Sequence, residues 1–338
     1  MNGTANTEGR RNKRILSIDG GGILGTFPAA FLAGLEGNLD RPIGDYFDLI
    51  VGTSTGGIIA TGLAHGMKAS KVLEFYEKEG PSIFFDDHRG IARWFFRAMR
   101  ELRHSWVSKY DPGRLEGALR GAFKETRLGD LQRRLVLPAW NPDIQRVYIY
   151  KTPHHPRLQF DRHVSLVDAT MATASAPTYF PQHKTKQNVG LIDGGVWANN
   201  PIAVAVVEAI TLLGWDPKSL DVLSLGCLDE IYRTPTNPGW GRLNKGLITL
   251  FMDGQKHGAM GMAKLLTGHG HERNAIYRIT QTAPRDHFKL DDTASIGTLA
   301  GLGYAKAREQ FPHLQKVFFD QPTADFQPSP PSTPEAAT

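Results

Sequence analysis

The sequence is poor in the features that mark secreted and membrane-spanning proteins. Its 338 residues include a single cysteine, Cys227, which excludes an internal disulfide and fits a reducing compartment. No run of about 18 or more apolar residues is present, so no transmembrane helix is expected. The first ten residues are polar and lack the apolar segment of a secretory signal. We therefore expect a cytoplasmic protein.

A strong excess of one charge is also missing. The chain has 39 Lys and Arg against 34 Asp and Glu, a formal charge of +5, and its hydrophobic content of 41% is that of a globular protein. Such a modest excess can favour anionic partners such as lipid headgroups or nucleotides, but it serves solubility equally well. We expect no DNA or RNA polymer as a partner, and a homo-oligomer is compatible with the composition.

Linker-like stretches and internal repeats are absent between the two ends of the chain. Residues 1–13 are polar and end in basic residues, which indicates a flexible tail. Residues 321–338 are rich in proline and serine, which disfavours packing and indicates a second flexible tail. The sequence therefore predicts one domain over residues 14–320, which includes a C-terminal extension.

Short apolar runs that end in glycine turns indicate buried strands separated by helices. Strands are expected at 14–19, 47–51, 146–150 and 221–225, and helices at 27–35 and 57–66. This alternation predicts an α/β fold in which helices cover both faces of a mostly parallel central sheet. Such sheets place their functional sites at the carboxyl ends of their strands.

The segment Gly52-Thr53-Ser54-Thr55-Gly56 follows the second expected strand and precedes a helix. It matches G-x-S-x-G, the nucleophile elbow, in which a sharp turn lifts the serine hydroxyl clear of the backbone. An ordinary strand-to-helix turn of small residues is the alternative. The strand–turn–helix context favours Ser54 as a nucleophile.

A second glycine turn follows the first expected strand. Gly20, Gly22 and Gly25 satisfy the dinucleotide pattern G-x-G-x-x-G, but that interpretation needs an acidic residue at the end of the next strand. Asp40 has the right distance along the chain and lies instead in a turn. The alternative is a loop whose N–H groups stabilise an oxyanion at a helix N-terminus.

The general base is harder to assign from spacing. His257, His269 and His271 follow Ser54 and could complete a triad, but too few strands precede Ser54 for the usual hydrolase order. Asp193, delivered by an apolar run into the turn Gly194-Gly195, is a second candidate. It would need a desolvated site that raises its pKa and direct contact with Ser54. An ordinary Asp-Gly-Gly turn is about equally compatible with the spacing.

These motifs, taken in order, resemble the patatin-like phospholipases. The glycine loop, the serine elbow and the Asp-Gly-Gly turn are accompanied by residues 174–181 (ASAPTYFP) and 196–201 (VWANNP), and the resemblance covers about 14–230. It implies a three-layer α/β fold with the elbow after the second strand. It also implies a Ser54–Asp193 dyad that needs no histidine, metal or other cofactor.

The resemblance further implies that Gly20, Gly21 and Gly22 donate the oxyanion hydrogen bonds. Many family members carry Arg or Lys where this chain has Leu24, so a charge–phosphate role at that position is in doubt. The overall plan resembles the phospholipase effectors of bacterial anti-phage defence, which are activated by cyclic oligonucleotides. A cyclic dinucleotide activator such as cyclic GMP-AMP is then expected, together with peripheral action on the inner membrane.

Residues 89–106 form an amphipathic pattern. Trp94 and Phe95 share its apolar face, and Arg93 and Arg97 lie on the opposite face. Arginine opposite aromatic residues is typical of a helix at a lipid surface, which gives the hypothesis of a movable cap or a membrane-docking element. An amphipathic helix packed on the protein body, with a solvated basic face, is the commoner origin of such a pattern.

Three functions remain from the sequence. The leading one is a phospholipase A-type enzyme that cleaves glycerophospholipid esters through an acyl-Ser54 intermediate. A constitutive lysophospholipase or esterase with the same dyad is the second. A nucleotide-binding module with a vestigial site is the third, although the intact Ser54 and Asp193 motifs argue against it.

Overall fold

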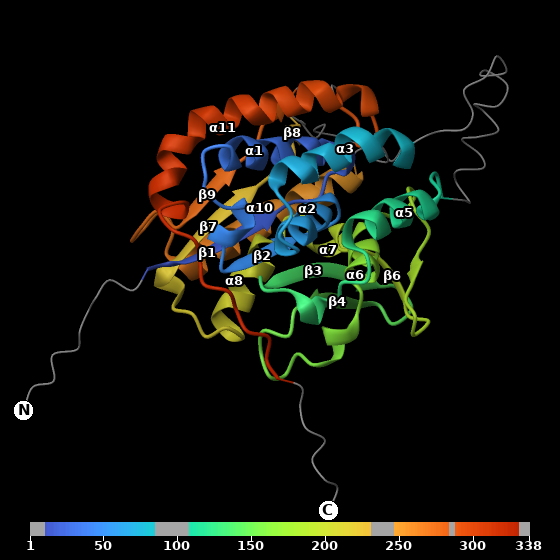
Figure 1. Ribbon diagram of the computed structural model, residues 1–338, viewed down its shortest axis with the longest axis horizontal. Helices are drawn as coiled ribbons and strands as arrows, with labels where there is room; N and C mark the ends of the chain where they lie inside the picture. The colour runs from blue at the N-terminus through green and yellow to red at the C-terminus, as the bar shows by residue number, and fades with distance from the viewer. Residues whose placement is uncertain (1–10, 85–107, 231–246, 284–287, 331–338) are drawn as a thin grey trace, which may run out of the picture.

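Strands and helices alternate along the chain in the computed structural model, which describes residues 11–84, 108–230, 247–283 and 288–330 (Figure 1). The strands are β1 (Lys13–Ile18), β2 (Leu49–Gly52), β3 (Leu135–Asn141), β4 (Arg146–Lys151), β5 (His183–Lys184), β6 (Gly190–Asp193), β7 (Leu220–Leu225), β8 (Asp229–Glu230), β9 (Ile276–Ile279) and β10 (Thr282–Ala283). The α-helices are α1 (Thr26–Glu36), α2 (Thr55–Ala64), α3 (Ala69–Ile83), α5 (Pro112–Phe123), α6 (Leu166–Ala174), α7 (Gly195–Ala198), α8 (Ile202–Thr211), α10 (Leu247–Thr267) and α11 (Ile296–Phe318). Short 3-10 turns occupy Gly22–Gly25, Ile43–Tyr46, Leu128–Asp130, Phe160–His163, Pro217–Ser219 and Thr293–Ser295.

The central sheet has eight strands, and most of its length is parallel. Its order is β5-β6-β3-β2-β1-β7-β9, and β4 pairs with β3. The pairs from β3 through β2, β1 and β7 to β9 are parallel, whereas β4 and β6 run antiparallel to β3. The carboxyl ends of β1, β2 and β7 therefore lie at one edge, where the glycine turns follow.

Both faces of the sheet are covered by helices because successive strand residues point to opposite sides. In β1, Leu16 and Ile18 belong to a large core shared with α1, α2, α3, α5, α6 and α11, and Ile15 belongs to a second core shared with α8 and α10. This arrangement confirms the predicted three-layer α/β fold, and the expected strands and helices start and end within about two residues of the observed ones.

The longest helix among the described residues, α11, lies along α1 on the outside of the larger core (Figure 1). Gly303 permits this close approach, because a Cβ there would lie 2.5 Å from the carbonyl oxygen of Phe27. Helix α1 follows the first glycine loop directly, so α11 packs against the helix that continues from that loop. No helix within the described part of the chain has both the length and the apolar character to cross a bilayer.

The C-terminal tail differs from the sequence expectation up to residue 330. Phe326 is buried, Thr323 donates from its N–H to the carbonyl of Asp45 at 2.7 Å, and Ser329 donates to that of Pro153 at 2.7 Å. Backbone hydrogen bonds and one buried aromatic ring thus dock a segment whose proline and serine content predicts flexibility. At the other end, Lys13 belongs to β1 rather than to a tail.

Candidate active site

Ser54 occupies a strained turn between β2 and α2. Its backbone has φ 57° and ψ −128°, in the left-handed half of conformational space that non-glycine residues rarely adopt. A Cβ at Gly52 would lie 2.1 Å from the carbonyl oxygen of Gly56, and one at Gly56 would lie 2.3 Å from that of Ile18. The two glycines are therefore needed for the close approach that a nucleophile elbow requires.

The two threonines of the elbow anchor it to its neighbours. The Thr53 hydroxyl donates to the carbonyl of Ala198 in α7 at 2.7 Å, and the Thr55 hydroxyl donates to the carbonyl of Gly22 at 2.7 Å. The elbow is thereby tied both to the Asp193 turn and to the glycine loop.

The pairing of β3 explains how Asp193 reaches Ser54. Along one edge β3 pairs with β4, as Val136 with Lys151 and Ala139 with Tyr148. The opposite edge is shared: Val136 pairs with Val51 of β2, and Ala139 pairs with Asp193 of β6. Because β2 and β6 run in opposite directions along this edge, their carboxyl ends meet head to head. The serine that follows β2 and the aspartate that ends β6 are thus brought together from 139 residues apart in the sequence.

Asp193 is 3% exposed and sits against the elbow. Its Oδ1 accepts the N–H of Gly195 at 2.6 Å, and its Oδ2 is buried. Burial raises the pKa of this carboxyl to about 7, although hydrogen bonding from Ser54 and Gly195 opposes the rise. The carboxylate is therefore a much stronger base than an aspartate in water.

The glycine loop contains two N–H groups that have no acceptor among the described residues. The N–H of Gly20 already donates to the carbonyl of Asn199 at 3.0 Å, which removes it from the three donors predicted from the sequence. The N–H groups of Gly21 and Gly22 donate to none of the described residues. Gly22 has φ +57°, and a Cβ there would lie 2.3 Å from the carbonyl oxygen of Leu290. Only glycine fits this position.

Ser54, Asp193, Gly21 and Gly22 all line one cavity of about 490 Å³. Its walls are largely apolar and come from α2, α3, α5, α10 and the segment before β5. They include Ile58, Phe75, Tyr76, Ile83, Phe84, Leu115, Pro177, Tyr179, Phe180, Phe251 and Met252. A cavity of this character suits an acyl chain, with its ester placed at the polar floor.

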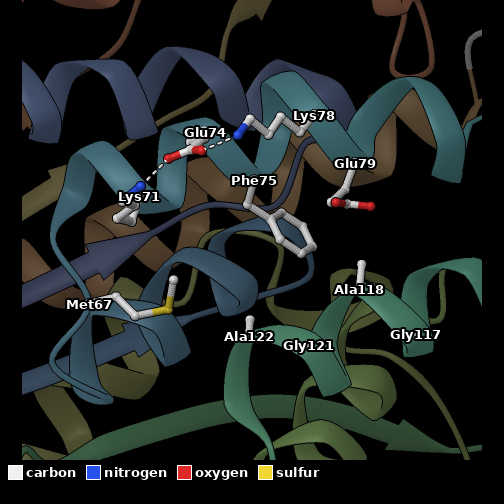
Figure 2. Close-up of a pocket in the computed structure, with 10 residues that line it drawn as sticks. All are labelled: Met67, Lys71, Glu74, Phe75, Lys78, Glu79, Gly117, Ala118, Gly121 and Ala122. Atoms are coloured by element: carbon white, nitrogen blue, oxygen red, sulfur yellow. Dashed lines mark hydrogen bonds and ion pairs between the residues drawn. The ribbon is translucent and has the colours of Figure 1, made fainter.

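A second hollow of similar volume, about 500 Å³, lies between α3 and α5. Figure 2 shows Glu74 of α3 reaching Lys71 and Lys78 on its own helix, opposite the small residues of α5. The lining has no serine, threonine or cysteine, so these residues offer no hydroxyl or thiol nucleophile for acyl transfer.

Comparison with known proteins agrees with this geometry. The patatin-like phospholipase profile matches residues 16–206, which include the glycine loop, the elbow and Asp193. The chain belongs to this family. Relatives named cGAMP-activated phospholipase occur in Pseudomonas aeruginosa (33% identical, over 83% of this chain and 78% of the relative) and in Escherichia coli (33%, over 93% and 94%). One from Vibrio cholerae is 30% identical over 93% of this chain and 96% of the relative.

Several other residues singled out in the sequence lie away from the patatin site. Leu24 is buried in the larger core, and Asp40 is exposed in its turn. His269 accepts N–H groups of Ala275 and Ile276 through Nδ1, which gives it a structural role. His257 and His271 are exposed and line no part of the described cavity. Trp94, Phe95, Arg93 and Arg97 lie outside the described residues.

Sequence reasoning missed the groups that the region after residue 206 brings to the site. Leu290 accepts the N–H of Ile23 through its carbonyl at 2.8 Å, and Gln255 accepts the N–H of Asn199 at 2.8 Å. Gln255 accepts through its side-chain Oε1, whereas Leu290 accepts through its backbone, and a backbone acceptor leaves no pattern in a sequence. Arg278 does leave a signal, since it is a charge inside the short apolar strand β9.

Proposed function

We propose that this chain is a phospholipase of the serine hydrolase class that cleaves glycerophospholipid esters. In this proposal Ser54 is the nucleophile, Asp193 is the base, and the N–H groups of Gly21 and Gly22 bind the oxyanion. The observation that carries the proposal is the meeting of Ser54 with a buried carboxylate of raised pKa on the floor of an apolar cavity. The alternative of a vestigial site is disfavoured by the same observation.

The first half of the reaction forms an acyl-enzyme. Asp193 takes the proton of the Ser54 hydroxyl while Oγ attacks the ester carbonyl carbon. The negative charge that develops on the carbonyl oxygen is stabilised by Gly21 and Gly22. When the tetrahedral intermediate collapses, the bond to the lysophospholipid oxygen breaks, and Asp193 returns its proton to that oxygen.

The second half frees the enzyme. Water attacks the acyl-Ser54 carbonyl carbon while Asp193 accepts a proton from the water, and the oxyanion forms again beside Gly21 and Gly22. Collapse breaks the bond to Oγ, which regains the proton from Asp193. A fatty acid leaves, and no metal or organic cofactor enters any step of this proposed cycle.

Apolar side chains at the mouth of the cavity support a lipid surface as the source of substrate. Phe251 is 67% exposed and Val196 is 48% exposed, and both line the cavity. Leu290, which is also exposed, lies at the same mouth. Exposed apolar residues grouped at a site are typical of contact with membranes or other apolar partners. We propose that the enzyme acts peripherally on the inner membrane from the cytoplasm.

The relatives supply the proposal for regulation. Three of them carry names that state activation by cGAMP, and two match this chain over more than nine-tenths of both lengths. We therefore propose that a cyclic dinucleotide switches this enzyme on, as in anti-phage defence, and that the active enzyme degrades the membrane of its own cell.

Fatty-acid release from phospholipid vesicles, with and without a panel of cyclic di- and trinucleotides, tests the function. Release that depends on Ser54 and appears with one cyclic dinucleotide is the expected result, and Ser54→Ala is the control. Equal release with and without nucleotides would retain the dyad and leave a constitutive esterase or lysophospholipase. Nucleotide binding without any Ser54-dependent turnover would leave a binding module.

A further inference from the structure

A buried ion pair joins the glycine loop to a strand that lies outside the matched patatin region. Asp19 follows β1 and directly precedes Gly20. Its two carboxylate oxygens accept from the Arg278 guanidinium of β9, Oδ1 from Nη1 at 2.9 Å and Oδ2 from Nη2 at 2.5 Å. Asp19 is 4% exposed and Arg278 is 19% exposed. A bidentate contact of this kind fixes the orientation of a carboxylate as well as its charge.

The arginine must cross one complete strand to reach Asp19. The order β1-β7-β9 places β7 between the two residues, and Arg278 is in register with Ser224 of β7. Ser224 accepts from Nη1 at 2.8 Å on the way. A Cβ at Gly226 would lie 2.5 Å from Nη2, so the glycine after β7 leaves the space through which the guanidinium passes.

Asp19 lies next to the proposed oxyanion loop, so the ion pair can affect the position of that loop. At most two residues lie between Asp19 and either Gly21 or Gly22. The N–H groups of these two glycines face the reacting carbonyl in the proposed mechanism. The backbone of Asp19 is also fixed, because its N–H donates to the carbonyl of Leu225 at 2.9 Å. Without a cation, its carboxylate would be an unpaired buried charge beside the place where a negative oxygen develops.

We propose that Arg278 is a positioning residue for the oxyanion loop. It holds Asp19, and through Asp19 the direction of the Gly21 and Gly22 N–H groups, and it cancels a negative charge that would oppose the transition state. It touches no substrate. The inference rests on the proposed function, because it assigns a role within the same acyl-transfer site.

The physical consequence is a selective loss of turnover. Donors to an oxyanion act only when they point at the place the oxygen occupies in the transition state, and a misplacement of about 1 Å costs on the order of a hundredfold in rate. Ground-state binding of the acyl chain depends on the apolar walls instead. Removal of Arg278 should therefore lower kcat and leave KM nearly unchanged.

A matched control exists at the other end of the same two strands. Arg273, just before β9, forms an ion pair with buried Asp221 of β7 and donates to the carbonyl of Leu220 at 2.6 Å. This pair also joins β7 to the β9 region, but at the amino end of β7, away from the loop. Arg273→Met therefore removes a comparable ion pair without touching the proposed mechanism.

The experiment measures kcat and KM for p-nitrophenyl butyrate with cyclic GMP-AMP present, alongside Tm, for Arg278→Met, Arg278→Lys and Arg273→Met. Arg278→Met is expected to lower kcat by about tenfold to a hundredfold with KM within about threefold. Arg278→Lys, which keeps the charge and loses the fork, is expected to fall between it and the wild type. Arg273→Met is expected to lower Tm and to retain kcat.

Two further variants keep the test decisive if Arg278→Met fails to fold. Gly226→Ala preserves both charges and crowds Nη2, so a lowered kcat with unchanged KM supports the positioning role. Asp19→Asn/Arg278→Met removes both charges together and leaves no unpaired buried charge, so a lowered kcat with unchanged KM in this variant also supports the positioning role.

Full kcat in Arg278→Met, or in Gly226→Ala when Arg278→Met does not fold, would overturn the inference, as would equal kcat losses in Arg278→Met and Arg273→Met. Absence of Ser54-dependent turnover in the wild type would instead contradict the proposed function.

Discussion

The matched patatin region, residues 16–206, and the described residues after it contribute to the site in different ways. The first region supplies every group that we place at the reacting atoms: Ser54, Asp193, Gly21 and Gly22. The second supplies what surrounds them: the Leu290 carbonyl against Gly22, Gln255 behind Asn199, the Arg278 guanidinium on Asp19, and Phe251 at the mouth. The groups that we place at the reacting atoms therefore all come from residues 16–206, whereas the contacts that position these groups come from both regions.

This difference explains why the recognisable motifs lie in residues 16–206. A nucleophile turn or an oxyanion loop restricts consecutive residues, because a side chain at Gly52, Gly56 or Gly22 would collide with backbone. A supporting contact restricts much less. The Leu290 carbonyl could come from any residue type, so selection at that position leaves no pattern.

The largest loss of activity is expected when either member of the proposed dyad is replaced. Ser54→Ala and Asp193→Asn are each expected to lower kcat by on the order of ten-thousandfold or more, because the residues act as a unit. Fatty-acid release from vesicles measures this loss. Ser219→Ala, a serine in a 3-10 turn before β7, is the control and should keep full activity. If either dyad variant retained a tenth of the wild-type rate, the substituted residue would not belong to the dyad.

Stability should reveal the burial of Asp193 independently of turnover. Its folded pKa is raised from 3.8 to about 7, so between these values the folded state keeps a proton that the unfolded state has lost. The group therefore lowers the free energy of unfolding as pH rises, by about 4 kcal/mol in total. Asparagine does not titrate.

We therefore expect Asp193→Asn to gain stability over the wild type as pH rises from about 4 to 7, with little further change above. Urea unfolding at pH 4, 5.5 and 8 measures the difference. A constant difference across this range would show that Asp193 is not buried as a proton-binding group.

The rate of ester hydrolysis should also depend on the protonation of Asp193. Below about pH 7 the Asp193 carboxyl is protonated and cannot accept the Ser54 proton. We expect kcat/KM for a soluble ester to rise about tenfold per pH unit from pH 5 to 6 and to level off above about 7. A profile that is flat from pH 5 to 8 would remove Asp193 from the role of base.

Replacing Phe251 tests whether the residues after 206 contribute to membrane binding. Phe251→Ser removes an exposed aromatic ring at the cavity mouth and should weaken vesicle binding by about tenfold to a hundredfold, since burial of such a ring contributes about 1.5–3 kcal/mol. Activity on a soluble ester should change little. Phe160→Ser is the matched control, because Phe160 is 94% exposed and lies outside the cavity. Equal effects of the two variants would argue against docking at the mouth.

The sequence predicts much of the fold because its strands are apolar runs closed by glycine turns. It does not predict that β6 runs against β3 and shares an edge with β2, since strand direction depends on contacts far apart in the chain. For the same reason the spacing alone is about equally compatible with Asp193 as the base and with an ordinary turn, and only the family resemblance favours the base. The raised pKa of Asp193, the occupied N–H of Gly20 and the docked segment 321–330 follow from packing that no local pattern encodes.

The most direct test of the account is the rate at which a fluorophosphonate probe labels the protein, with the modified residue located by peptide mass spectrometry. The probe needs an activated serine and leaves a tetrahedral phosphorus adduct whose phosphoryl oxygen takes the place of the oxyanion. We predict a single adduct on Ser54, formed faster as pH rises through about 7 and almost absent in Asp193→Asn. Labelling of another residue, or equal rates in the wild type and Asp193→Asn, would contradict a Ser54–Asp193 dyad.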